Sequence, residues 1–154
     1  MRLFIICFAI VVLAGCGKDK FTTAPQIKFQ SLNPNAWRAG NTSVDKDIAP
    51  KIKIRLTDAE GDVGFKPDSD TSWIFIRRTN NTTWDSLRLP AISFTGKSFQ
   101  ADVEINIFEM MRYGNCPAGG SDLDTMYFEL YLQDFAKNKS NTITTEDPVY
   151  YICR

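Results

Sequence analysis

The stretch KIKIRLT at residues 51–57 decides the fold class of this chain. Its apolar residues Ile52, Ile54 and Leu56 alternate without error with charged or hydroxyl-bearing residues. Successive side chains of an extended chain point to opposite faces, so a period of two predicts a β-strand with one buried face.

The same alternation recurs on the C-terminal side of this segment. Residues 99–107 and 126–133 alternate apolar and polar side chains and are expected to be the longest further strands. Residues 73–78 are rich in aromatic and β-branched residues, four of them in a row at 73–76, which predicts a strand that is covered on both faces. Shorter strands are expected at 27–32, 87–89, 142–144 and 149–153, and 108–113 is the one expected helical turn.

Seven or eight short strands with polar turns between them, and no alternating helices, predict an all-β fold. The spacing of the strands fits an antiparallel sandwich of the immunoglobulin-like or fibronectin type. Periodicity does not distinguish two packed sheets from one rolled sheet, so a small closed β-barrel is the alternative.

The N-terminus matches the pattern of an export signal. Arg2 is followed by an apolar run over residues 3–14, and the run ends in Leu13-Ala14-Gly15-Cys16. This pattern resembles the lipobox of bacterial lipoproteins, in which the signal peptide is removed before a cysteine that carries lipid. The run is too short to span a bilayer, which takes about 20 apolar residues. An ordinary secretory signal followed by a chance cysteine is the alternative.

The resemblance implies a domain organisation and a location. Residues 1–15 would be the signal peptide, 16–25 the lipidated cysteine and a polar tether, and 26–154 the sandwich. The protein would be exported and held on a membrane by the lipid on Cys16, since two or more acyl chains anchor a protein stably. Lys18 and Asp19 after the cysteine resemble the charged signal that sends some Gram-negative lipoproteins to the outer face of the outer membrane. A solvated linker is the alternative explanation of this pair.

The resemblance also bears on the four cysteines. Cys7 would leave with the signal peptide and Cys16 would carry lipid, so Cys116 and Cys153 would remain. Exported proteins meet an oxidising compartment, so these two are expected to form a disulfide. Two buried free thiols are the alternative, because spacing in the sequence does not establish that the two lie within bridging distance.

Composition excludes several kinds of function. The chain has 18 basic and 18 acidic residues and no basic stripe, so nothing in its charge favours a nucleic-acid partner. It contains no histidine, which excludes a Ser-His-Asp or Cys-His catalytic pair and histidine-ligated metal sites. We therefore expect the protein not to be an enzyme. A glycosidase using two carboxylates is the less favoured alternative.

Two loops carry polar motifs: TDAEGDVG at 57–64 and DFAKNKSN at 134–141. Both resemble loops that occur together in small Gram-negative lipoproteins with immunoglobulin-like domains, where an acidic Asp-Gly-Asp loop comes early and an Asp-x-x-Gly-Asn hairpin comes late. Glu60 and Lys137 depart from the aspartate and glycine of that pattern. Lys137 leaves the shape of the late turn open, because a residue with a side chain adopts positive φ at a cost.

The early loop is the candidate metal site. Asp58, Glu60 and Asp62 place carboxylates at alternate positions, and Asp134 would approach from the late loop if both loops lie at one end of the sandwich. Crowded carboxylate oxygens suit calcium. The alternative is that these acids cap turns through hydrogen bonds to the backbone.

Three roles remain for the mature domain. The leading expectation is a non-catalytic module that binds an envelope protein or a glycan. The alternatives are a calcium-stabilised structural subunit of an envelope complex and the glycosidase. Trp37 and Trp84 lie among polar residues and are candidate exposed rings for a sugar, whereas Trp73 is expected in the core.

Overall fold

The computed structural model of the chain describes residues 21–38, 46–64, 71–89, 96–112, 116 and 122–153. The predicted signal peptide and Cys16 lie outside these residues. Among the described helices, none is both long and apolar enough to cross a membrane.

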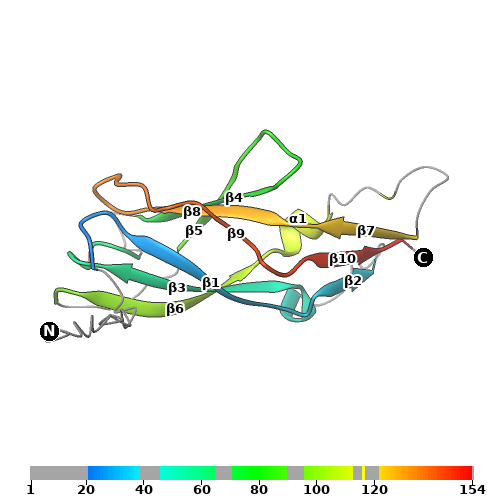
Figure 1. Ribbon diagram of the computed structural model, residues 1–154, viewed down its shortest axis with the longest axis horizontal. Helices are drawn as coiled ribbons and strands as arrows, with labels where there is room; N and C mark the ends of the chain where they lie inside the picture. The colour runs from blue at the N-terminus through cyan, green and yellow to red at the C-terminus, as the bar shows by residue number, and fades with distance from the viewer. Residues whose placement is uncertain are drawn as a thin grey trace, which may run out of the picture.

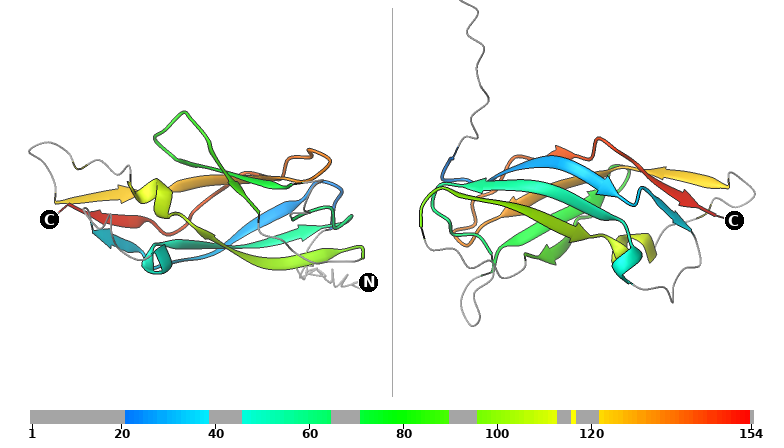
Figure 2. Two further views of the ribbon diagram at one scale, coloured as in Figure 1. Left: turned by 180° about the vertical axis from the view of Figure 1, so that it is seen from behind. Right: turned by 90° about the horizontal axis from the view of Figure 1, so that it is seen from below.

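The fold is an all-β sandwich with two main layers (Figure 1). The first layer consists of β1 (Gln26–Asn33), β3 (Lys51–Asp58) and β6 (Phe99–Asn106), in the order β1-β3-β6. All its neighbours pair antiparallel. The view from below in Figure 2 shows these three strands side by side.

The second layer has the order β5-β4-β8-β9 and is also antiparallel throughout. It consists of β4 (Trp73–Arg78), β5 (Asp85–Arg88), β8 (Phe128–Gln133) and β9 (Ile143–Thr144). As described, the sheets do not close on one another, so the sandwich prediction is confirmed and the closed-barrel alternative is wrong.

A third sheet joins the layers at one end of the molecule (Figure 1). In it β10 (Val149–Ile152) lies between β2 (Ala36–Arg38), which it pairs parallel, and β7 (Leu123–Met126), which it pairs antiparallel. The short helices η1 (Lys46–Ile48) and α1 (Phe108–Arg112) complete the described elements. The strand predicted at 126–133 is therefore two strands that meet at Tyr127 and belong to different sheets.

The core lies between the two main layers. Ile52, Ile54 and Leu56 of β3 are fully buried, as the alternation predicted, and so are Leu130 and Leu132 of β8. Burying a side chain of this size stabilises the fold by about 1.5–3 kcal/mol relative to leaving it exposed. The facing apolar rows of these strands hold the two sheets together and fix which strand ends meet.

Strand β4 differs from the prediction. Ile74 and Ile76 are buried in the core, but Trp73 and Phe75 are only half-buried. The strand thus has one covered face and one outer face lined by aromatic rings. The prediction that this strand is covered on both faces is therefore wrong, although the strand is rich in aromatic and β-branched residues.

Candidate functional site

The early loop is built around the carboxylate of Asp58, the last residue of β3. Its Oδ2 accepts hydrogen bonds from the backbone N–H groups of Glu60, Gly61 and Asp62. Gly61 has a φ of 70°, which glycine adopts without a steric cost. The predicted turn-capping role is confirmed for Asp58, because one carboxylate oxygen organises the whole turn.

The late loop is organised in the same way by Asp134, which follows β8. Its carboxylate accepts hydrogen bonds from the backbone N–H of Asn138, at 2.7 Å, and from the side-chain amide of Asn138, at 2.9 Å. Lys137 adopts a φ of 69°, so the turn keeps a left-handed residue where the related pattern has glycine. The hydrogen bonds of the loop thus hold Lys137 in a conformation that a side chain disfavours.

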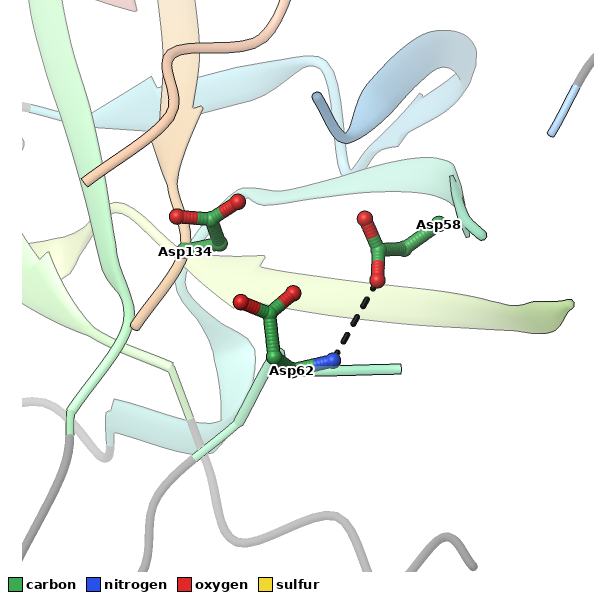
Figure 3. A group of neighbouring side chains, drawn as sticks. All are labelled: Asp58, Asp62 and Asp134. Atoms are coloured by element: carbon green, nitrogen blue, oxygen red, sulfur yellow. Dashed lines mark hydrogen bonds between the residues drawn. The ribbon is translucent and has the colours of Figure 1, made fainter. Parts of the chain in front are cut away.

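The two loops meet at one end of the sandwich, as the calcium hypothesis requires. Asp58, Asp62 and Asp134 each offer a carboxylate oxygen, and these three oxygens lie within 4.8 Å of one another. Figure 3 shows the three carboxyl groups facing a common space, with Asp58 also bound to the backbone N–H of Asp62. Residues far apart in the sequence therefore form one cluster, which we call the aspartate triad.

Burial raises the pKa of all three carboxyl groups of the aspartate triad. For Asp58, burial outweighs the backbone N–H groups that favour its charged form. The pKa of Asp62 is raised by burial and then by the charge of Asp58, and the pKa of Asp134 by burial and the charge of Asp62. For Asp62 and Asp134, repulsion adds to desolvation, because a like charge this close opposes ionisation.

Glu60 does not belong to the cluster, so its prediction as a ligand is wrong. Its side chain is exposed, and its carboxylate is not among the grouped oxygens. Residues at alternate positions share a side only in an extended chain, whereas this segment curls around the carboxylate of Asp58. The turn brings Asp62 to the cluster and leaves Glu60 pointing to solvent.

Trp37 is a core residue, so the expectation of an exposed ring there is wrong. It lies on β2, is 6% exposed, and packs edge-on against Phe108 with ring centroids 6.0 Å apart. The short strand β2 pairs with β10, and that pairing places one side of β2 against the core. No local pattern in the polar segment around Trp37 indicates this.

Trp84 does lie at the surface, half-buried, where it joins a group of rings that the sequence did not predict. Phe75 and Tyr131, paired across β4 and β8, stack with ring centroids 4.7 Å apart. Trp84 packs edge-on against Tyr131 at 4.8 Å. With Trp73, also on β4, these half-buried rings form what we call the outer aromatic strip.

Polar side chains line the outer aromatic strip. Arg77 lies over the ring of Trp84, 4.5 Å from its centroid, and is paired with Glu129 of β8 through a contact of 2.6 Å. Lys139 lies over the ring of Tyr131 at 3.9 Å. The face therefore combines flat apolar rings with donors and acceptors of hydrogen bonds.

Cys116 and Cys153 form a disulfide, with Cα atoms 5.6 Å apart, as predicted. Cys153 follows β10, so the bridge lies at the end of the sandwich opposite to the ends of β3 and β8 (Figure 1). The aspartate triad and the disulfide thus occupy opposite ends of the molecule.

Comparisons of the chain with protein-family models, with curated proteins and with solved structures found no match.

Proposed function

We propose that this chain is an exported lipoprotein, anchored through lipid on Cys16, whose sandwich is a non-catalytic binding module for a glycan of the cell envelope. The observation that carries the glycan assignment is the outer aromatic strip on β4 and β8. The anchor is supported by the lipobox-like end of the N-terminal apolar run.

A half-exposed row of rings suits a sugar. One face of a pyranose presents C–H groups, which pack on an aromatic ring, while its hydroxyls need polar partners at the rim. Trp73, Tyr131 and Trp84 offer the rings, and Arg77 and Glu129 offer the polar groups. Apolar lining with a few placed polar groups is the usual composition of a small-molecule site.

A cation already lies over each of these three rings, so a sugar would have to displace it: Lys139 over Tyr131, Arg77 over Trp84 and Arg88 over Trp73. An exposed cation–π contact stabilises by only about 0.5–1 kcal/mol. This cost is small beside the burial of an aromatic face, for which the apolar area removed from water contributes about 25 cal/mol per Å². The cations therefore do not block the strip.

Binding of the full-length protein to an array of bacterial envelope polysaccharides tests the proposal. Trp84→Ala is expected to weaken binding at least about tenfold, the equivalent of 1.4 kcal/mol. Tyr150→Ala is the matched control, because this exposed aromatic residue lies on β10 in another sheet. The glycan role is rejected if the wild type retains no glycan, or if both variants bind like the wild type. Crosslinking of one envelope protein through the strip would replace the glycan by a protein partner.

The anchor is tested separately by metabolic labelling with an alkyne analogue of palmitate. The wild type is expected to be labelled and to partition with membranes. Cys16→Ser is expected to be unlabelled. Labelling of neither protein would support the ordinary secretory signal instead.

A further inference from the structure

We propose that Asp58, Asp62 and Asp134 bind one calcium ion, which ties the early loop to the late loop at the tether end of the sandwich. The three oxygens lie within 4.8 Å of one another and face one space, two of them from the early loop and one from the late loop (Figure 3). None of these three residues belongs to the outer aromatic strip, and their test involves no glycan.

An unpartnered buried oxygen points to a ligand. Asp58 is 0% exposed, and while its Oδ2 accepts the hydrogen bonds of the turn, its Oδ1 has no hydrogen-bond partner among the described residues. Oδ1 of Asp62 is unpartnered in the same way. Burying a carboxylate oxygen without a partner is costly, and buried charges are usually paired or coordinate metals.

Protein cations do not account for these oxygens. None of the ion pairs found in the described part of the chain reaches the aspartate triad. Backbone N–H groups satisfy Asp58 Oδ2 and the amide groups of Asn138 satisfy Asp134, but they carry no full charge. Three carboxylates in one cluster, with Asp58 and Asp134 fully buried, are stabilised by a positive counter-charge, which a divalent ion supplies.

The ligand type and spacing favour calcium. Carboxylate oxygens are hard ligands, and calcium–oxygen bonds of about 2.3–2.6 Å let one ion bridge oxygens up to about 4.6–5.2 Å apart. The triad oxygens, within 4.8 Å, satisfy that limit without rearrangement. Magnesium bonds of about 2.0–2.1 Å would require the oxygens to move closer, and its octahedral geometry tolerates less variation.

At this position the ion would connect two loops that both contact the beginning of the sandwich. The backbone N–H of Ala59 in the early loop donates to the carbonyl of Thr22, in the segment that enters the sandwich. Asn141 of the late loop binds the backbone of Ile27 at the start of β1. An ion between the two loops would therefore stiffen the end of the domain where the tether arrives.

The test is isothermal titration of the full-length protein with calcium chloride, together with thermal melts in calcium, in magnesium and in chelator. Millimolar calcium is expected to raise the melting temperature by about 5 °C or more over the value in chelator. Magnesium at the same concentration is expected to give a smaller rise.

Asp62→Asn and Glu60→Gln are the matched variants, since both remove one charge from the same loop but only Asp62 belongs to the triad. Asp62→Asn is expected to weaken calcium binding at least tenfold and to melt higher than the wild type in chelator, because it removes repulsion. Glu60→Gln is expected to bind calcium like the wild type. The higher melting temperature separates a lost ligand from a misfolded variant.

Two outcomes would overturn the proposal. One is the absence of both binding heat and thermal stabilisation in the wild type, which would mean that the carboxyl groups share protons instead of a metal. The other is equal loss of calcium binding in Glu60→Gln and Asp62→Asn, which would place the ion elsewhere on the loop.

Discussion

The backbone N–H of Phe135 donates a hydrogen bond of 3.0 Å to the carbonyl oxygen of Asp62. This bond joins the early and late acidic loops through main-chain atoms, so their proximity does not depend on the side chains of the aspartate triad. The carboxylates are thus held close together by the fold. Burial raises the pKa of all three, and the charge of a neighbouring aspartate adds to this for Asp62 and Asp134.

The pH dependence of stability follows from these shifts. Burial and mutual repulsion raise the folded-state pKa of Asp62 above its unfolded value, so the folded protein binds the proton more tightly. The contribution of Asp62 to folding stability is therefore fully present below its unfolded-state pKa, and it is lost as the pH rises through its folded-state pKa. In chelator, Asp62→Asn is expected to be more stable than the wild type at pH 7, with a gap that narrows toward pH 4.

Urea unfolding of both proteins across this pH range measures that gap. The difference in stability between the two proteins is the quantity to compare, because other carboxylates change the stability of both proteins with pH in the opposite direction. For Asp102, the hydrogen bond from Arg55 lowers the pKa, which gives stability that is lost as the pH falls. A gap that widens toward low pH would contradict the shift assigned to Asp62.

Asn141 fastens the late loop to the first strand. Its Oδ1 accepts from the backbone N–H of Ile27 and its Nδ2 donates to the carbonyl of Ile27, both at 2.9 Å. Asn141→Ala is expected to reduce the free energy of unfolding by about 2 kcal/mol, since a net hydrogen bond contributes about 0.5–1.5 kcal/mol. Urea unfolding measures the loss. The exposed Asn80 provides the control, and equal effects of Asn80→Ala and Asn141→Ala would refute the assignment.

Lys137 is expected to be a suboptimal residue for its turn. At a φ of 69° it adopts a left-handed conformation that costs a residue with a Cβ about 1–2 kcal/mol. Lys137→Gly removes this cost, but glycine also increases the entropy of the unfolded chain, which offsets part of the gain. The free energy of unfolding is therefore expected to rise by up to about 1 kcal/mol.

Lys139→Gly should have the opposite sign, since Lys139 forms a β-bridge with Gln133 in extended backbone. Thermal melts of the two variants at fixed calcium give the comparison. A destabilised Lys137→Gly would show that the side chain of Lys137 contributes more than its backbone geometry costs.

The disulfide crosslinks the chain at the end of the sandwich opposite to the aspartate triad. Its cysteines are 37 residues apart in the sequence. On the chain-entropy model, opening a loop of this size costs about 3–4 kcal/mol. The double variant Cys116→Ala/Cys153→Ala is expected to lose that amount in urea unfolding. Reductant should destabilise the wild type and leave the double variant unchanged, and a wild type that is insensitive to reductant would contradict a structural bridge.

The strands were largely predictable because their signal is local. Ile52, Ile54 and Leu56 alternate with polar residues whatever their partners are, and the structure buries all three. Strand β2 was not predictable, because its three residues form a strand only through pairing with β10. The break at Tyr127 is likewise a change of sheet, which leaves no interruption in the alternating pattern.

The candidate sites divide in the same way. Asp58 and Asp134 were identifiable because each directly follows a clear strand and caps its own turn. Glu60 was assigned wrongly because the curl of the turn decides which acids converge. Trp37 was assigned wrongly because the pairing of a distant strand buried it.

The sequence by itself determined the all-β class, the main strands, the two acidic turns and the candidate cysteine pair. Each of these depends on neighbouring residues, on a period of two, or on a count of reactive groups. Only the tertiary structure decided that Asp134 joins Asp58 and Asp62, and that Trp84 meets the stacked rings of Phe75 and Tyr131. These contacts depend on which strands pair and in which register, and the packing of the whole core determines that pairing.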